Sequence, residues 1–550
     1  MKSKLLSIVL AAVLVLALCV PALAEGGLSE PGVYPIWTGD EPYVLKVLVC
    51  TNAHVSDWDD NTFTKWVEEK CNVDLQFEFL PEVEPKQKLT IMLDTNEELP
   101  DVVLYGLSVA EAYNYGSKGK FVNLREYLDD GLGVNIDSAV ERFPTWNLIT
   151  NITNSDGSVY AVPKIQASPQ NETKYKLWIN KTYLDNLGLE MPTDTDEFRE
   201  MLEAFRDNDA NGNGNPGDEV PMDFNGWFGS AYSLSNMIGS WGIQLVNWGY
   251  DGYFAEGGVI KNFAVDERYK GMMTYLADLY AEGLINPNAI TNDYSMFQSL
   301  SRGDADGNAL VGVVLGWEET DKFGPNIYNQ YIPCGPFVDD VDELATSEPR
   351  WTYDFSGLNM SSNRVAMSAK CANPEAAMKF IDKFYEPQHS VESLFGGVLD
   401  GNLEIVGDDH YKVLDPPEEA HTDNGTWKWT STFADNGPMY IRRATQIDMA
   451  KDMAFALAER DQYKEAIARI DMENEYYPQF LMKYSVDDQN TLAQLQVGIT
   501  SVTDSWWGMW MTGEADINDT WEDYVAEVNA NGLEQVLAIR QAAYDAWKAQ

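Results

Sequence analysis

The feature that most constrains the fold is an alternation of strand-like and helix-like segments between residues 44 and 105. Residues 44–50 (VLKVLVC) form a short β-branched apolar run, which is typical of a buried parallel strand. Residues 63–70 carry apolar side chains at helical spacing, and residues 73–79 alternate apolar and polar side chains as strands do. A helix over 86–93 and a strand over 101–105 follow. This β-α-β-α-β order predicts a right-handed parallel sheet with helices on its faces.

A second α/β unit begins with a strand-like segment at residue 177. Thr193 and Asp196 form a capping-box-like start to the next helix. One apolar stripe of this helix comprises Phe198, Met201, Leu202 and Phe205. Later elements are expected as helices over 266–282, 374–386, 446–470 and 533–547 and as a buried strand over 311–315. Two such units joined by connecting segments predict a cleft, because ligands of open α/β sheets bind beyond the carboxyl ends of the strands.

The N-terminus has the three parts of a secretory signal peptide. Residues 1–4 carry the positive charges, residues 5–18 form an apolar run, and the small-residue triplet 22–24 (ALA) follows. The run is shorter than the roughly 20 apolar residues that a membrane helix needs. We expect a signal peptide over 1–24 with cleavage after it, and a lipid anchor at Cys19 remains the alternative. The Gly- and Pro-rich residues 25–42 are expected to form a flexible leader.

The chain is strongly acidic, with a net charge of −49 over 550 residues. Such a surface repels nucleic acid and anionic lipid, and it disfavours acidic ligands because no basic run is present. Four cysteines follow the signal peptide, and their wide spacing matches no zinc pattern, so free and paired thiols both stay open. They are Cys50, Cys71, Cys334 and Cys371.

Residues 209–219 (DANGNGNPGDE) form the most specific local motif. Calcium takes six to eight oxygen ligands, and a loop with oxygen side chains at alternate positions supplies them. The motif departs from the usual EF-hand loop because its closing acids stand at positions ten and eleven. We predict a structural Ca²⁺ site with the ligands Asp209, Asn211, Asn213, Asn215, Asp218 and Glu219. A second segment, with Asp304, Asp306 and Asn308, lacks downstream acids and is predicted to be a turn without metal.

Aromatic residues are abundant, with 17 tryptophans and 28 tyrosines. Sugar rings stack their apolar C–H faces on aromatic planes, while their hydroxyl groups need polar partners at the ring edge. Many of the tryptophans lie in polar or Gly-rich surroundings, which favours exposed platforms and a carbohydrate ligand. No G-x-S-x-G elbow, P-loop or dinucleotide fingerprint occurs in the sequence.

Five segments, in their order and spacing, resemble one known family. They are 156–163 (DGSVYAVP), 177–188 (LWINKTYLDNLG), 281–287 (AEGLINP), 513–524 (GEADINDTWEDY) and 532–545 (GLEQVLAIRQAAYD). The family is the extracellular solute-binding proteins of ABC importers, family 1. The chain is most similar to the long, calcium-bearing oligosaccharide-binding members, which include the alginate-binding and LplA-like proteins.

The resemblance implies a two-lobe α/β fold of the periplasmic-binding-protein type II, with a hinge and a mixed, mainly parallel sheet in each lobe. It implies a monomer without catalytic residues that closes on an oligosaccharide and delivers it to the permease subunits of an ABC transporter. Lobe 1 is expected over 43–160 plus about 310–365, and lobe 2 over about 170–305 plus about 373–550. The crossovers are expected near 160–176, 305–312 and 363–373.

The cleft residues of the family vary with the ligand, so they do not carry over by resemblance. The predicted ligand-binding residues are Trp58, Asp59 and Asn61 on one lobe, Trp227 and Trp241 on the other, and Trp317 and Trp351 near the hinge. Two other functions stay open from the sequence. One is a secreted carbohydrate hydrolase that uses paired carboxylates, and the other is a surface sugar sensor or adhesion component without transport.

Overall fold

The computed structural model describes most of the chain from Gly27 onwards. The described residues are 27–549 apart from 53–54, 82–84, 96–98, 108, 143–144, 168–174, 228–231, 247–250, 317–322, 325, 339–347, 354–357, 398–400, 421–423, 434–435 and 449–461. The predicted signal peptide and Trp317 therefore lie outside the described residues.

The first lobe is built on a six-stranded sheet with the order β16-β6-β13-β3-β1-β2. β1 (Tyr43–Cys50) pairs in parallel with both β2 (Val73–Leu80) and β3 (Val102–Leu104), so β2 is an edge strand. The intervening helices are α2 (Thr62–Cys71) and α3 (Pro85–Thr95), which confirms the β-α-β-α-β order predicted from the sequence.

Later segments of the chain complete the first lobe. β13 (Leu358–Met367) pairs antiparallel with β3 and β6 (Val162–Ala167), and β16 (Met439–Ile441) pairs in parallel with β6. α13 (Pro374–Lys383) packs on β13, and α14 (Pro387–Phe395) packs on β16. The remaining elements of this part are α4 (Val109–Ser117), α5 (Arg125–Asp129), α6 (Val134–Asp137), β4 (Val140–Arg142), β5 (Thr145–Asn147), α7 (Leu148–Ile152), β14 (Leu403–Gly407), β15 (His410–Val413), η6 (Glu418–Ala420), α15 (Asn424–Thr430) and β17 (Gln446–Asp448).

The segment that precedes β1 is attached to the first lobe, so the expectation of a flexible leader over 25–42 is wrong for its described part. Ile36 is 1% exposed, and its N–H donates to the carbonyl oxygen of Cys71 at 3.1 Å. The Tyr34 hydroxyl lies 3.1 Å from Nδ1 of the buried His389, and Lys383 lies over the Tyr34 ring. Gly and Pro set the turns of this segment, but its few apolar side chains are enough to bind it to the core.

The second lobe is built on a four-stranded sheet with the order β12-β7-β11-β8. β11 (Val311–Gly316) pairs in parallel with β8 (Val220–Asp223) and antiparallel with β7 (Lys176–Asn180), and β12 (Tyr331–Cys334) lies outside β7. The predicted apolar stripe of α9 (Thr195–Asp207) is buried. The N-cap of α9 is Asp194, whose side chain accepts from the Glu197 N–H, whereas Thr193 donates to the Glu197 carboxylate. Other elements are α8 (Lys181–Leu187), η2 (Leu234–Trp241), β9 (Tyr253–Glu256), β10 (Val259–Asn262), η3 (Phe263–Val265), α11 (Tyr294–Ser301), η4 (Tyr328–Gln330), α17 (Lys464–Ala468) and η8 (Gln479–Leu481).

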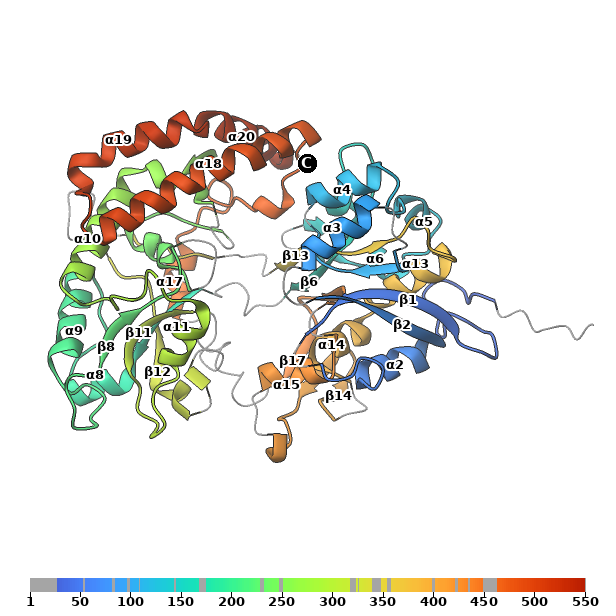
Figure 1. Cartoon of the computed structure of the whole chain (residues 1–550), viewed down its shortest axis with the longest axis horizontal. Coiled ribbons are helices and arrows are strands. Elements are labelled where there is room, and N and C mark those ends of the chain that lie inside the picture. The colour runs from blue at the N-terminus through green and yellow to red at the C-terminus, as the bar shows by residue number, and fades with distance from the viewer. Residues whose placement is uncertain are drawn as a thin grey trace, which may run out of the picture.

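Three long helices at the end of the chain cover the second lobe (Figure 1). They are α18 (Val486–Met511), α19 (Ile517–Ala530) and α20 (Leu533–Lys548). α18 and α19 pack on α10 (Glu267–Ala281), and α20 packs on α18, α19 and β10. Aromatic rings form much of the contact: Trp510 and Tyr524 meet with ring centroids 4.7 Å apart. None of the helices in the described part of the chain combines the length and apolar content that a bilayer span requires.

The division of the chain between the lobes differs from the expected one. β11 and β12 belong to the second sheet, so 310–365 is not a continuous part of lobe 1. β16 and the helices α13 and α14 belong with the first sheet, so lobe 2 does not start at 373. The chain passes between the sheets after Ala167, between Cys334 and Leu358, and after Asp448, rather than near 305–312 and 363–373. A uniformly apolar run such as 311–315 is buried in either sheet, so its sequence does not indicate which sheet it joins.

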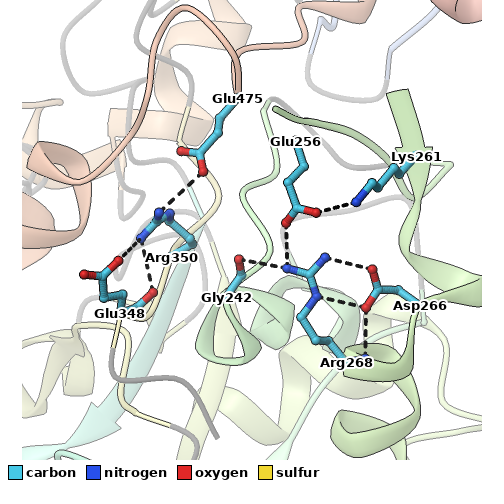
Figure 2. Close-up of polar contacts among 8 residues, drawn as sticks. All are labelled: Gly242, Glu256, Lys261, Asp266, Arg268, Glu348, Arg350 and Glu475. Carbon is cyan, nitrogen blue, oxygen red and sulfur yellow. Dashed lines mark hydrogen bonds and ion pairs between the residues drawn. The ribbon is translucent and has the colours of Figure 1, made fainter. Parts of the chain in front are cut away.

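Two arginines hold the connections of the second lobe in place (Figure 2). Arg268, near the start of α10, forms two hydrogen bonds to Asp266 at 2.9 and 2.8 Å and one to Glu256 at 2.8 Å. Glu256 ends β9 and also accepts from Lys261 of β10, so the hairpin is tied to the helix. Arg350 contacts the Glu475 carboxylate at 3.4 Å, and its own N–H donates to the carbonyl oxygen of Gly239 at 2.7 Å. These contacts fix the chain just before it returns to the first lobe.

All four cysteines of the described chain are free thiols. Cys71 and Cys334 are fully buried and belong to different lobes. Burial raises the pKa of each of these two thiols to about 12. They are therefore inert core residues rather than reactive groups.

Candidate functional site

A groove of about 510 Å³ lies on the first lobe, between the connection after β1 and the edge strand β2. Its floor is aromatic: the Trp58 ring lies 5.5 Å from Phe77 and 5.9 Å from Phe79, measured between centroids. Phe79 is 38% exposed and so presents a ring to solvent. Among the described residues, the rim carries three carboxylates and no basic side chain. The described lining residues are Ser56, Asp57, Trp58, Asp59, Asp74, Leu75, Gln76, Phe77 and Phe79. The aromatic floor suits the apolar C–H face of a sugar ring, and the polar groups of the rim suit the hydroxyl groups at the edge of the ring.

The three residues predicted for the first lobe have different environments. Trp58 lines the groove but is only 7% exposed, so it supports the neighbouring rings from below. Asp59 is exposed on the rim. Asn61 is 4% exposed and caps α2, because its Oδ1 accepts from the Phe63 and Thr64 N–H groups. Its Nδ2 donates to the carbonyl oxygens of Thr430 and Thr432, so the prediction of a free ligand contact at Asn61 is wrong.

The other predicted tryptophans that the structure describes are core residues, not exposed platforms. Trp227 is 3% exposed and stacks on Trp507 with centroids 5.2 Å apart. Trp241 is 1% exposed, and its ring lies 5.6 Å from the Tyr275 ring. Trp351 is 2% exposed, and its Nε1 donates to the carbonyl oxygen of Tyr175 at 2.6 Å. The polar residues next to these tryptophans in the sequence suggested that the rings are exposed. In the fold, segments distant along the chain cover the rings.

Sequence reasoning missed Phe79 and Asp74 as groove residues. The alternation over 73–79 identified Phe79 as a strand residue and suggested that it faces the core. Only the position of β2 at the edge of the sheet leaves the last ring of that row exposed. An aromatic residue at the end of an alternating strand is the signal that could have indicated it.

The predicted calcium loop is compact and rich in oxygen atoms. Asn211 Oδ1 accepts from the Asn213 N–H, and Asn213 Oδ1 accepts from the Asn215 N–H, at 2.9 and 2.8 Å. The amide groups of Asn211 and Asn213 donate to the two oxygens of Asp218. Gly214 has φ of +91°, a left-handed conformation that favours glycine. The loop thus folds around its own oxygen-bearing side chains.

Two carboxylate oxygens of this loop are buried without a hydrogen-bond partner among the described residues. They are Oδ1 of Asp209 and Oε2 of Glu219. Burial raises the pKa of Glu219. A buried, unpaired carboxylate oxygen is costly, and a hard cation offsets that cost. The donor set therefore fits Ca²⁺, although within the described ranges no three His, Cys, Asp or Glu side chains gather as a metal site.

The second acidic segment is a turn, as predicted. Asp304 Oδ1 accepts from the Asp306 and Asn308 N–H groups, both at 2.9 Å, and its Oδ2 accepts from the Asn308 side chain at 2.8 Å. Both carboxylate oxygens are satisfied within the turn, which lowers the pKa of Asp304.

A buried carboxyl group lies at the carboxyl end of β8. Asp223 is 0% exposed, its Oδ1 accepts from the Asn286 side chain at 3.0 Å, and its Oδ2 has no hydrogen-bond partner among the described residues. Burial raises the pKa of Asp223 to about 7. Because this pKa is raised in the folded state, the stabilising contribution is complete below about pH 4 and is lost as the pH rises through 7.

We therefore predict that Asp223→Asn weakens the pH dependence of stability. The wild type should lose on the order of 2 to 4 kcal/mol more free energy of unfolding than the variant between pH 5 and pH 8. Burial also raises the pKa of Asp382, to about 6, but this group affects both proteins equally. Urea unfolding at both pH values measures the difference. Equal pH dependence in the two proteins would show that Asp223 stays ionised throughout.

Comparison with known proteins places the chain among solute-binding proteins. The model for the bacterial extracellular solute-binding protein family matches residues 55–389. The fructooligosaccharide ABC transporter substrate-binding protein FusA of Streptococcus pneumoniae is 24% identical over 484 residues, which cover 82% of this chain and 81% of FusA.

Solved structures share the two-lobe fold. An HMO-binding, ABC-transporter-associated solute-binding protein from Bifidobacterium longum infantis is 26% identical with a TM-score of 0.80, over 92% of this chain and 100% of that protein. An EF-hand mutant of S. pneumoniae FusA in complex with fructo-nystose is 21% identical with a TM-score of 0.77, over 92% and 99% of the two chains. The fold is the expected α/β two-lobe fold. The expectation of a mainly parallel sheet in each lobe is wrong for the second lobe, where two of the three strand pairings are antiparallel. The chain belongs to the bacterial extracellular solute-binding protein family.

Proposed function

We propose that this protein is the ligand-capturing component of an ABC importer and that it binds a neutral oligosaccharide outside the cytoplasm. The observation that carries the proposal is the groove on β2, with aromatic rings below and hydrogen-bonding groups at the rim. Relatives that bind fructo-oligosaccharides and human milk oligosaccharides support the ligand class. The proposed role is non-catalytic: a ligand that contacts both lobes stabilises a closed form, and that form is delivered to the permease.

Charge selects the kind of sugar. Asp57, Asp59 and Asp74 line the groove, and no basic side chain is among the lining residues that the structure describes. The whole chain adds a net charge of −49. Uronate-bearing chains would therefore be repelled at the site and at long range, whereas neutral sugars would find hydrogen-bond acceptors for their hydroxyl groups.

Titration calorimetry with kestose, fructo-nystose and a human milk oligosaccharide mixture tests the proposal, with polygalacturonate as the acidic comparison. We expect heat of binding with at least one neutral probe and none with the polyuronate. Chromatography of the sugars after incubation must show them unchanged, because cleavage products would identify a hydrolase. Binding of the polyuronate alone would contradict the proposed ligand class.

The exposed ring of Phe79 gives a prediction that separates binding from folding. Phe79→Ala removes a stacking surface, so affinity for the bound sugar should fall about five- to tenfold, from a contact of about 1 kcal/mol. The melting temperature should change little, because the ring is 38% exposed. Ile91→Ala removes a side chain that is 53% exposed on the same lobe and is the matched control, with unchanged affinity expected. Equal affinity of Phe79→Ala and wild type would show that the groove is not part of the binding site.

We propose in addition that the 209–219 loop holds a structural Ca²⁺. Asp209 and Glu219 would supply their unpaired oxygens, and Asn211, Asn213, Asn215 and Asp218 would supply the others. The ion would neutralise the buried charge and tie the end of α9 to the start of β8. A relative described as an EF-hand mutant supports a calcium loop in this group of proteins.

Chelation is expected to lower the melting temperature by roughly 5 °C, because a ligand at a hundred times its dissociation constant stabilises by about 2.7 kcal/mol. Added Ca²⁺ should restore the wild-type value. Asp209→Ala should melt at the lower temperature whether or not calcium is present. Asp304→Ala, in the turn that satisfies its own carboxylate, should keep the full response. A wild-type melt that does not respond to the chelator would count against the site.

We also propose export by the predicted 1–24 signal peptide, with cleavage after Ala24 and a lipid anchor at Cys19 as the alternative. The N-terminal order of a charged segment, an apolar segment and small residues supports export, as does membership of an extracellular family. Mass spectrometry of the mature protein tests it, because an N-terminal Glu25 and a lipid-modified Cys19 differ in mass.

A further inference from the structure

The carboxylates of the groove on β2 have no positively charged partner among the described residues. Asp57 Oδ1 accepts from the backbone N–H groups of Asp59 and Asp60, both at 3.0 Å, and Asp74 Oδ2 accepts from the Gln76 side chain at 3.1 Å. In the described part of the chain, the Asp59 side chain has no hydrogen bond, and none of the three lining carboxylates forms an ion pair. The groove therefore keeps free acceptor oxygens and a local negative charge.

These charges are close enough to act on a fourth carboxyl group. Glu68, in the adjacent helix α2, accepts from the Leu75 N–H of β2 at 2.9 Å. Burial raises the pKa of the Glu68 carboxyl group, and the charges of Asp74 and Asp59 raise it further. The wall of the groove is thus unfavourable for another negative charge and favourable for a positive one.

The aromatic floor of the groove adds to the preference for a cation. A ligand that lies on Trp58, Phe77 and Phe79 removes water from the neighbouring carboxylates, and that desolvation is costly unless a charge compensates it. Hydroxyl groups compensate only in part because they are neutral donors, whereas an ammonium group forms charge-assisted hydrogen bonds. Aromatic faces also attract cations that lie within about 6 Å of the ring centroid.

One buried donor calls for an acceptor on the same ligand. Trp58 lines the groove and is 7% exposed, and its indole N–H has no hydrogen-bond partner among the described residues. A buried indole N–H usually has a partner, and an oxygen atom of a sugar would supply one. The side chain of a lysine offers an ammonium group but no acceptor. An amino sugar carries both groups, so it fits the groove better than the lysine side chain of a protein partner.

We propose that the groove on β2 selects a sugar unit with a free amino group, such as an unacetylated hexosamine, within an otherwise uncharged oligosaccharide. The ammonium group lies among the carboxylates of Asp57, Asp59 and Asp74, and the C–H face of the ring packs on Phe79. The Trp58 indole N–H donates to an oxygen of the same unit. This inference rests on the proposed function and narrows its ligand class.

Calorimetry on the full chain with two matched trisaccharides tests the inference. One is the trisaccharide of glucosamine, and the other is its fully N-acetylated form, which has the same rings and linkages but no charge. At pH 6 and low salt, we expect the amine form to bind about tenfold more tightly, a difference typical of one charge-assisted hydrogen bond. The preference should shrink as the salt concentration rises, because salt screens the attraction.

Variants at the rim identify the carboxylates that are responsible. Asp59→Asn and Asp74→Asn keep an acceptor oxygen but lose the charge, so each should lower the affinity for the glucosamine trisaccharide about fivefold and leave that for the acetylated form unchanged. Glu78→Gln is the matched control. Glu78 is exposed on β2 but is not among the described lining residues, since side chains alternate between the two faces of a strand. The control should bind both trisaccharides as the wild type does, and all three variants should melt within a few degrees of it.

The outcomes separate this inference from the proposed function. Equal affinity of the wild type for both trisaccharides, or binding of kestose without binding of the glucosamine trisaccharide, would overturn the amine assignment and leave the proposed function in place. Binding of the amine form that neither Asp59→Asn nor Asp74→Asn weakens would also overturn it, because the attraction would then come from the charge of the whole chain. Equally tight binding of a lysine tripeptide would indicate a protein partner, with the same consequence. If the wild type binds none of these sugars nor the milk oligosaccharide mixture, the proposed function fails and the amine assignment fails with it.

Discussion

Gly239→Ala is expected to destabilise the second lobe by about 3 kcal/mol, a large loss for a single added methyl group. A Cβ at this position would lie 2.2 Å from the Arg350 carbonyl oxygen, 2.7 Å from its carbonyl carbon and 2.9 Å from Cα of Trp351. All three atoms belong to the backbone, so no side-chain rotation relieves the clash. The two segments are also hydrogen-bonded, since the Arg350 N–H donates to the Gly239 carbonyl oxygen at 2.7 Å.

The same clash would displace the chain where it leaves the second lobe. Arg350 and Trp351 precede β13, which belongs to the first sheet, so a shift here is transmitted to the connection between the lobes. We therefore expect weaker sugar binding as well as a lower melting temperature. Gly508→Ala is the control, because no atom lies within 4 Å of its added Cβ and it is inside α18. That change should stabilise by about 0.5 to 1 kcal/mol. A Gly239→Ala protein as stable as wild type would contradict the packing of these segments.

Arg540→Met is the second change for which a large loss is expected, of about 3 kcal/mol. Arg540 is 7% exposed in α20, and its guanidinium forms an ion pair with Asp251 at 3.0 Å. The same group donates to Gln479 at 3.2 Å and lies 3.9 Å from the centroid of the Tyr253 ring. Methionine keeps most of the volume but leaves a partly buried carboxylate and several acceptors without a donor.

Chemical denaturation and a double-mutant cycle measure this effect. Asp251→Asn combined with Arg540→Met should cost less than the sum of the two single changes, because the uncompensated charge is gone. Arg125→Met breaks an exposed i,i+4 pair with Asp129 and should cost less than about 1 kcal/mol. Strictly additive losses in the cycle would mean that Arg540 stabilises α20 by packing alone.

Local patterns identified much of the first lobe. The apolar run at 44–50 and the alternation at 73–79 became β1 and β2 because a strand shows its period over a few residues. The stripe from Phe198 to Phe205 became the buried face of α9 for the same reason. The 209–219 loop also carries its geometry locally: its oxygen atoms, its left-handed Gly214 and its closing acids are all within eleven positions.

Those local patterns did not predict which aromatic residues are exposed for binding. Trp227, Trp241 and Trp351 looked exposed from their neighbours, but α18, Tyr275 and Tyr463 cover them. The exposure of Phe79 depends on which strand lies at the edge of the sheet. Such properties arise from packing between segments that are distant along the chain.

The sequence by itself determined the class of most elements, the first parallel unit and the composition of the acidic loop, because periodicity, capping and turn chemistry act over a few residues. Only the tertiary structure decided that 311–316 joins the second sheet and 439–441 the first, and which aromatic rings reach solvent. The physical reason is that burial and strand pairing are satisfied between segments hundreds of residues apart, and a uniformly apolar run satisfies them equally well in either lobe.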